Sequence, residues 1–248
     1  MKKPLILVVR EFDKFSSLLT ENGFEIINFP AIQTLPIEDF SELDGKIDNL
    51  NYYNGLFFTS PKAAEVFLQN IEDRKNDFRG KIYILGNRTK VLFENKNFEI
   101  VYRAGANTAE EFINSFDKDE FSSKKFLFLK GDKSLRAIPE LLKNWAMIDE
   151  TIVYRTIENE IDESLKIEIN KKLSKKEIDW ICFFSPSGIE SFIKTFGDFS
   201  PYEIKIAAIG TTTAKKAAEN NLKIEFVSSR ASTENFAFEL IDYIKNFE

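Results

Sequence analysis

Four polar turns hold the residues best suited to chemistry, and each turn follows a short apolar run. Two place Ser beside Pro, namely Thr59-Ser60-Pro61 and Ser185-Pro186-Ser187, and two begin with Gly, namely Gly86-Asn87-Arg88-Thr89 and Gly210-Thr211-Thr212-Thr213. Ser is a preferred N-cap and Pro fits the first helical position, so these turns predict helix starts. Because the free N–H groups of a helix start attract anions, the turns together predict a site for a multiply charged acid. Ordinary helix capping is the alternative.

The composition removes several kinds of catalytic chemistry. The 248 residues include no His and one Cys, Cys182. This excludes Ser–His and Cys–His nucleophile pairs, His-ligated metals, an internal disulfide and a thiolate-rich zinc site. The net charge of −6 disfavours binding to nucleic acid through a basic surface. We therefore expect no histidine- or thiolate-ligated metal site, and an inert, buried thiol at Cys182.

Two further side chains are candidates for the same site. Tyr154 lies in a β-rich run, and its phenol could donate a proton without histidine chemistry. Arg10 ends the first apolar run and could face the ligand. A structural tyrosine and a surface salt bridge are the respective alternatives.

Short apolar runs alternate with amphipathic stretches along the whole chain. Most runs lack period-2 alternation, which is typical of parallel strands covered on both faces, and most intervening segments have helical spacing. The pattern predicts an α/β fold with parallel sheets. The expected strands are Leu5–Val9, Phe24–Ile27, Gly55–Thr59, Ile82–Leu85, Phe98–Val101, Phe126–Leu129, Ile152–Tyr154, Trp180–Phe184, Ile206–Ile209 and Ile224–Val227. We also expect a surface loop at Asp117–Lys125, and packing roles for Trp145 and Trp180.

An internal repeat divides the chain into two similar lobes. The segment LFFTSPKAAEVF at Leu56 resembles ICFFSPSGIESF at Ile181, and IYILGNRTK at Ile82 resembles IAAIGTTTA at Ile206. LILVVR at Leu5 likewise resembles FLFLKG at Phe126. A near-constant offset across several blocks predicts two related α/β lobes.

Two extended segments mark the boundary between these lobes. FPAIQTLP at Phe29–Pro36 has a proline at each end, and ETIVYRTIE at Glu150–Glu158 is rich in β-formers. We expect a two-stranded β hinge at 30–36 and 150–156. One lobe would then combine residues 1–30 and 157–248, and the other would hold residues 37–149.

The same blocks resemble the uroporphyrinogen-III synthase family of tetrapyrrole and heme biosynthesis. The resemblance is carried by FFTSP at Phe57, LGNRTK at Leu85, IVYRT at Ile152, FFSPSGIESF at Phe183 and AAIGTTTA at Ala207. It implies two α/β lobes joined by a two-stranded β-ladder, with the active site in the cleft between them. It also implies a cyclising carbon–oxygen lyase that needs no cofactor. That enzyme closes hydroxymethylbilane, which has eight carboxylates, with loss of water and inversion of ring D.

The resemblance also assigns roles within the site. It aligns Tyr154 with the hinge-strand tyrosine of the family, a candidate acid for the departing hydroxyl. The family's Ser and Thr residues that line the cleft fall on Ser60, Thr89, Ser185, Ser187, Thr212 and Thr213. With the turns and Arg10, the expected substrate-binding set is Arg10, Thr59, Ser60, Gly86, Thr89, Ser185, Ser187, Gly210, Thr211, Thr212 and Thr213.

A second class of function fits the same architecture. Two α/β lobes with a hinge also describe a non-catalytic cytoplasmic binding or sensor module for a polyanionic, tetrapyrrole-like ligand. The apolar run Leu5–Val9 is too short for a secretory signal, and no run approaches the ~18 apolar residues of a membrane helix. We expect a cytoplasmic monomer. The resemblance also leaves room for transient hand-over of substrate from the preceding pathway enzyme.

Overall fold

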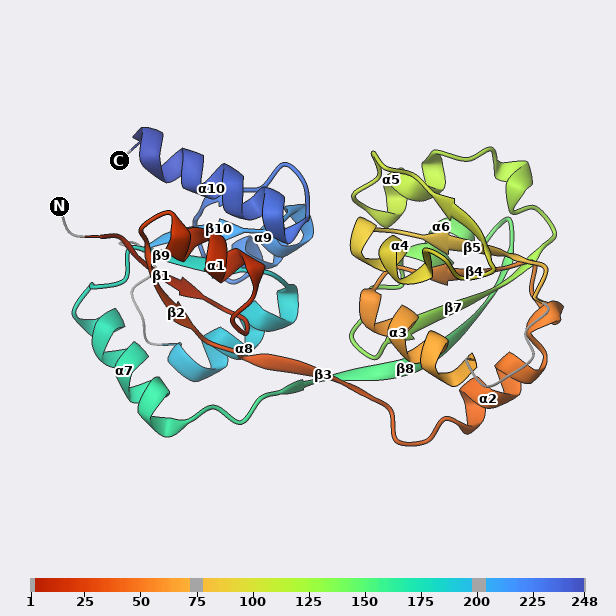
Figure 1. The fold of residues 1–248 in the computed structure, drawn as a ribbon, viewed down its shortest axis with the longest axis horizontal. Coiled ribbons are helices and arrows are strands. Elements are labelled where there is room, and N and C mark those ends of the chain that lie inside the picture. Colours follow the sequence, from red (N-terminus) through yellow and green to blue (C-terminus); the bar gives the residue numbers. More distant parts are fainter. Residues whose placement is uncertain (1–2, 72–77, 198–203, 248) are drawn as a thin grey trace. The chain divides into compact units, whose positions relative to one another are not determined.

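The computed structural model describes residues 3–71, 78–197 and 204–247. The chain divides into two compact units: unit 1 comprises Met1–Gln33 and Ile157–Glu248, and unit 2 comprises Thr34–Thr156. In Figure 1, unit 1 contains the red start and the cyan-to-blue end of the chain, and unit 2 contains the orange-to-green middle. Both chain ends therefore belong to one unit.

Unit 1 is built around a parallel sheet of strands in the order β11-β10-β9-β1-β2. Its strands are β1 (Leu5–Val8), β2 (Glu25–Asn28), β9 (Trp180–Phe183), β10 (Lys205–Ala208) and β11 (Ile224–Val227), and all their pairings are parallel. Helices α1 (Lys14–Glu21) and α10 (Thr233–Phe247) pack on one face. Helices α7 (Glu163–Ser174), α8 (Pro186–Phe196) and α9 (Thr211–Glu219) pack on the other.

Unit 2 repeats this plan with one additional strand. Its sheet has the order β3-β8-β7-β4-β5-β6, formed by β3 (Ile32–Pro36), β4 (Gly55–Phe58), β5 (Lys81–Ile84), β6 (Glu99–Tyr102), β7 (Lys125–Gly131) and β8 (Met147–Glu158). Helices α2 (Ser41–Asp48), α3 (Pro61–Ile71) and α4 (Asn87–Phe93) cover one face. Helices α5 (Ala109–Asn114) and α6 (Ala137–Leu142) cover the other, and 3₁₀ turns occupy Leu50–Tyr52 and Lys118–Glu120.

Helices on both faces explain the continuous apolar runs of the central strands. Every residue of β1, β4 and β9 is buried, which a strand with one solvated face would not allow. Each of the ten expected strands overlaps an observed strand, so the predicted α/β class with parallel sheets is confirmed.

The segment with a proline at each end forms a strand of its own. Strand β3 pairs with β8. Ile37 N donates to Val153 O at 3.2 Å, and Asn159 N donates to Ala31 O at 3.1 Å, so the two segments run in opposite directions. Both strands cross the boundary between the units, at Gln33–Thr34 and at Thr156–Ile157.

The two sheets match strand for strand, as the repeat predicts. In the order β11-β10-β9-β1-β2 and the order β6-β5-β4-β7-β8, the pairs β9/β4, β10/β5 and β1/β7 are the segments that the sequence repeat relates. Helices α3 and α8, which follow the matched strands β4 and β9, each have 11 residues.

Two local expectations held only in part. The segment expected as a surface loop is mostly exposed, but it includes the 3₁₀ turn and Phe121, which is only 1% exposed because it packs among Phe57, Tyr83 and Phe126. Trp145 is 37% exposed, with the Lys118 ammonium 4.7 Å from its ring, whereas Trp180 lies in the core. None of the described helices is long and apolar enough to cross a membrane.

Candidate functional site

In unit 2, the predicted site residues lie at the carboxyl ends of neighbouring strands. Strand register places Tyr154 of β8 beside Gly131 of β7, and Phe58 of β4 beside both Leu129 of β7 and Ile84 of β5. Thr59 and Ser60 follow β4, and Gly86 follows β5. This edge is where parallel α/β sheets bind ligands.

In unit 1, the other predicted residues occupy the equivalent edge. Val9 N donates to Cys182 O and Ile209 N donates to Phe183 O, both at 3.0 Å, which aligns the ends of β1, β9 and β10. The segments that follow those strands hold the remaining predicted residues, namely Arg10, Ser185, Ser187, Gly210, Thr211, Thr212 and Thr213.

The serine turns form the predicted N-caps. Ser60 Oγ accepts a hydrogen bond from Ala63 N at 3.2 Å, and Ser185 Oγ accepts one from Gly188 N at 3.1 Å. Pro61 and Pro186 each begin the helix that follows. The Ser185 and Ser187 hydroxyls lie 3.2 Å apart. Pro61 and Pro186 have no N–H group, and each cap uses the N–H group of the third helical residue. The N–H group of the second helical residue, Lys62 or Ser187, is not used by the cap, so capping and anion binding are compatible here.

The glycine turns present backbone rather than hydroxyl groups. Gly86 precedes α4 with φ 91°, a left-handed conformation that favours glycine. Gly210 precedes α9 with extended backbone, and neither residue provides a side-chain cap. The N–H groups at the starts of α4 and α9 are therefore not used by a capping side chain.

Thr89 and Thr213 are the most enclosed of the predicted hydroxyl residues, at 1% and 4% exposed. Each is the third residue of its helix, α4 or α9. Neither hydroxyl has a hydrogen bond to another described residue, and no buried polar side-chain atom of the described residues lacks a partner, so each hydroxyl oxygen reaches the surface. Thr211 and Thr212 are exposed, and Thr59, Ser60, Ser185 and Ser187 are partly exposed.

Most of the Tyr154 side chain is buried. It is 8% exposed and belongs to the apolar cluster beneath α2, α3 and α4. Its hydroxyl has no hydrogen bond to another described residue, and no buried polar side-chain atom of the described residues lacks a partner. The ring is therefore fixed by packing while its hydroxyl reaches solvent.

Arg10 takes part in a local cluster. Its guanidinium lies 3.2 Å from Asp13 Oδ2, donates to Thr233 Oγ1 at 3.5 Å, and sits 4.4 Å from the centre of the Phe184 ring. The ion pair with Asp13 is the surface salt bridge that the sequence analysis gave as the alternative role of Arg10. Cys182 is buried in β9, and burial raises the pKa of its thiol.

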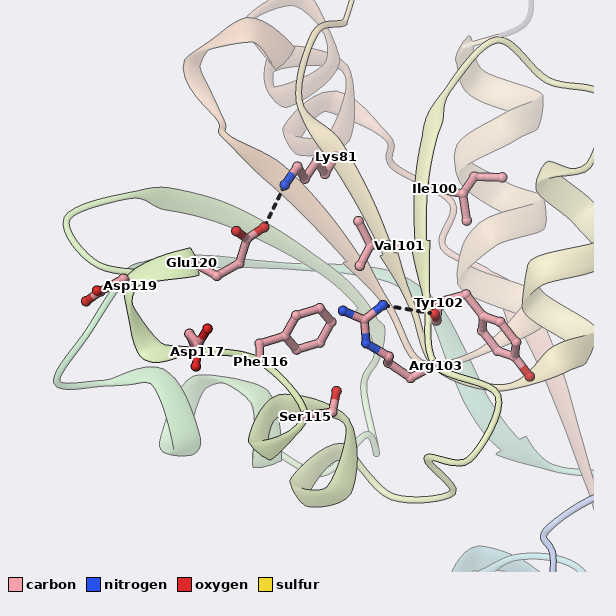
Figure 2. Close-up of a pocket in the computed structure, with 10 residues that line it drawn as sticks. All are labelled: Lys81, Ile100, Val101, Tyr102, Arg103, Ser115, Phe116, Asp117, Asp119 and Glu120. Carbon is pink, nitrogen blue, oxygen red and sulfur yellow. Dashed lines mark hydrogen bonds and ion pairs between the residues drawn. The ribbon is translucent and has the colours of Figure 1, made fainter.

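Unit 2 also contains a pocket of about 650 Å³ that holds none of the predicted site residues (Figure 2). It is lined by Lys81, Ile100, Val101, Tyr102, Arg103, Ser115, Phe116, Asp117, Asp119 and Glu120. Glu120 accepts hydrogen bonds from Lys81 Nζ at 2.8 Å and from the Tyr83 hydroxyl at 2.5 Å. These two bonds lower the pKa of Glu120, and burial together with Glu120 raises the pKa of Tyr83.

The sequence interpretation missed this pocket because it depends on contacts between distant segments. Lys81 begins β5, whereas Glu120 ends the 3₁₀ turn within the segment that was expected to be a surface loop. The Arg103 guanidinium lies 4.4 Å from the centre of the Phe116 ring, and Figure 2 shows it facing that ring. The available signal was Phe116 and Phe121, two large apolar residues bracketing an acidic run.

Fold and site together define a class: an α/β protein of two related parallel-sheet units, each with anion-attracting helix starts on the carboxyl edge of its sheet. The profile of uroporphyrinogen-III synthase HemD matches residues 13–237. The chain therefore belongs to the uroporphyrinogen-III synthase family.

Individual relatives agree with the family assignment. The chain is similar to the uroporphyrinogen-III synthase of Chlorobaculum parvum, with 24% identity over 92% of each chain, and to that of Schizosaccharomyces pombe, with 26% identity over 98% of each. Its fold is similar to the crystal structure of a mutant uroporphyrinogen III synthase from the extremely thermophilic bacterium Thermus thermophilus. That similarity has a TM-score of 0.66 and 13% identity, and it covers 98% of this chain and 99% of that one.

Proposed function

We propose that this protein is a uroporphyrinogen-III synthase that converts hydroxymethylbilane to uroporphyrinogen III. The family match over residues 13–237 carries the proposal. The helix starts on the sheet edges of both units support it, because a substrate with eight carboxylates needs several anion sites. An acidic protein can supply these through N–H groups without many formal cations.

The reaction begins with departure of the substrate hydroxyl. A proton is added to that hydroxyl, the C–O bond breaks, water leaves, and an azafulvene cation remains. Ring D attacks this cation through its substituted α-carbon to give a spiro intermediate. The intermediate fragments and closes again with ring D reversed, and loss of a proton gives the cyclic product.

In this proposal Tyr154 is the acid for the departing hydroxyl. A tyrosine held by packing, with its hydroxyl open to solvent, suits a donor that must keep one position. The substrate also cyclises unaided to the uninverted isomer. The protein therefore acts chiefly by holding the chain in one geometry and by stabilising the cation.

The helix-start turns bind the carboxylates. Ser60, Ser185, Ser187, Thr211 and Thr212 supply hydroxyls, and the first turns of α3, α4, α8 and α9 supply N–H groups. Thr59, Gly86, Gly210 and Arg10 complete the proposed set, with Arg10 acting from its cluster with Asp13. Thr89 and Thr213 contribute backbone N–H groups and the small exposed part of each side chain, its hydroxyl oxygen.

The test is an isomer assay. Freshly made hydroxymethylbilane is mixed with the purified protein, the products are oxidised, and porphyrin isomers I and III are separated by chromatography. We expect isomer III to predominate, against isomer I in the blank without protein. Isomer I alone from folded protein would contradict the proposal. If the protein also bound the linear tetrapyrrole tightly, the binding-module alternative would replace it.

The same assay addresses how the substrate arrives. We propose that one chain acts alone and receives substrate by transient hand-over, since free hydroxymethylbilane is lost to spontaneous closure. Hand-over predicts a higher fraction of isomer III when the preceding enzyme is present than when substrate is supplied free. Sedimentation velocity measures whether the active species is a monomer.

A further inference from the structure

The end of strand β7 is shaped to receive the Tyr154 ring. The β7–β8 register shifts between Lys130 and Gly131, so that Gly131 pairs with Tyr154. A Cβ at Gly131 would lie 2.4 Å from Tyr154 Cζ and 2.8 Å from its hydroxyl oxygen. The ring therefore occupies space that only a glycine leaves open.

The next residue, Asp132, holds the backbone of the same segment at two points. Its N–H donates to Tyr154 O at 3.1 Å, and its Oδ1 accepts from Thr156 N at 2.9 Å. The same Oδ1 accepts from Lys133 N at 2.8 Å. One residue thus fixes the backbone on both sides of Arg155.

These two hydrogen bonds of Asp132, called the clamp below, hold β8 close to the point where it leaves unit 2. β7 ends at Gly131, whereas β8 continues to Glu158, and Thr156 is the last residue of unit 2. The Asp132 carboxylate therefore extends the β7–β8 pairing after the strand itself has ended. Without the carboxylate, Thr156 N would lose its hydrogen bond to the residue that follows β7, just where β8 leaves the unit.

We propose that Asp132 is a positioning residue that fixes the Tyr154 hydroxyl for proton donation. This inference rests on the proposed function. Asp132 does not touch the substrate in this proposal; it acts through the backbone of Tyr154 and Thr156. The ring is held laterally by the Gly131 gap, and its position along β8 is held by Asp132.

The test uses Asp132→Ala, Asp132→Asn, Tyr154→Phe and the double variant Asp132→Ala/Tyr154→Phe. The control is Asp162→Ala, because Asp162 is also exposed, its Oδ1 accepts from Ser164 N at 2.8 Å as the N-cap of α7 in unit 1, and it has no role in the proposal. We expect Asp132→Ala to lower kcat for isomer III roughly tenfold with little change in KM. Asp132→Asn keeps an acceptor oxygen and should remain within about twofold of the parent. Asp162→Ala should leave kcat unchanged.

The double variant separates positioning from general loss of structure. If Asp132 acts through the Tyr154 hydroxyl, Asp132→Ala should lower kcat no further in the Tyr154→Phe background. Equal losses in both backgrounds would overturn the proposal, and so would full activity of Asp132→Ala or of Tyr154→Phe.

A measurement without activity keeps the inference distinct from the proposed function. Amide hydrogen exchange at Thr156 should be at least about tenfold faster in Asp132→Ala and near the parent rate in Asp132→Asn. Unchanged exchange in Asp132→Ala would overturn the clamp even in an active enzyme. If only isomer I, the spontaneous product, were found with the parent protein, the proposed function would be refuted. The catalytic role of Asp132 would then be refuted as well, whatever the exchange rates show.

Discussion

At Ser185 a single side chain caps a helix beside the proposed carboxylate site, so charge and capping can be separated by substitution. Asp, Asn and Ser are all good N-caps, and Asp also suits the dipole of α8. The free energies of unfolding of Ser185→Asp and Ser185→Asn should therefore both lie within about 0.5 kcal/mol of the parent value. Only the Asp variant places a negative charge where a substrate carboxylate is proposed to bind.

We expect Ser185→Asp to raise KM roughly five- to tenfold, because a carboxylate in this partly exposed position would repel the substrate carboxylate by about 1 kcal/mol. Ser185→Asn should raise KM less than about twofold. Steady-state isomer III formation and urea unfolding of the three proteins make the comparison. The pair Ser60→Asp and Ser60→Asn applies the same test to unit 2, where Ser60 caps α3 in the equivalent way. Equal KM values for the Asp and Asn variants would mean that α8 does not bind a carboxylate.

Single residues also show where sequence reasoning stops. The caps at Ser60 and Ser185 were predictable because a cap depends on residues within one turn. The near-complete burial of Thr89 and Thr213 was not, since it depends on how closely each helix start packs on its sheet. Tyr154 illustrates the same limit. Its residue type suggested chemistry, but the contact of its ring with Gly131 depends on a register shift in the pairing of β7 with β8, which composition does not reveal.

Among the elements, helices α2 and α4 offer a matched pair of glycines for testing backbone strain. A Cβ on Gly86 or on Gly45 would meet nothing within 4 Å, so packing does not distinguish them. Gly86 has φ 91°, whereas Gly45 lies inside α2. We expect Gly86→Ala to destabilise the protein by about 1 kcal/mol and Gly45→Ala to stabilise it by about 0.5–1 kcal/mol. Urea unfolding measures both, and destabilisation of equal size in the two variants would rule out conformational strain as the cause.

The elements themselves were largely predictable. Buried parallel strands are read from short apolar runs bounded by polar residues, and all ten expected runs became strands. The pairing of β3 with β8 required the hinge argument from two extended segments. The 3₁₀ turn at Lys118–Glu120 was missed because polar composition resembled a loop, while its position is fixed by Phe121 in a cluster of aromatic side chains from other strands.

On the scale of the whole molecule, unit 2 holds more of the partly buried carboxylates whose pKa is lowered than the described part of unit 1 does. In unit 2, burial alone would raise the pKa values of Asp149 and Glu150. Hydrogen bonds from Tyr53, Lys125 and Lys46 to Asp149, and from Lys130 and Arg136 to Glu150, outweigh burial and lower them. Glu120 in the pocket is lowered as well. Among the described residues of unit 1, Glu239 is the comparable carboxylate: burial would raise its pKa, but hydrogen bonds from the Ser228–Asn235 segment lower it.

A carboxyl with a lowered pKa stabilises the folded state above its unfolded pKa, and this stability is lost as pH falls through the folded pKa. Unit 2 should therefore lose more stability than unit 1 below about pH 5. Each unit has one tryptophan, Trp145 in unit 2 and Trp180 in unit 1. Fluorine NMR of protein labelled with 5-fluorotryptophan, with Trp145→Phe for assignment, follows both units in one acid titration. We expect the Trp145 signal to report unfolding at a higher pH than the Trp180 signal. Coincident transitions would mean that the two units unfold as one cooperative body despite their separate cores.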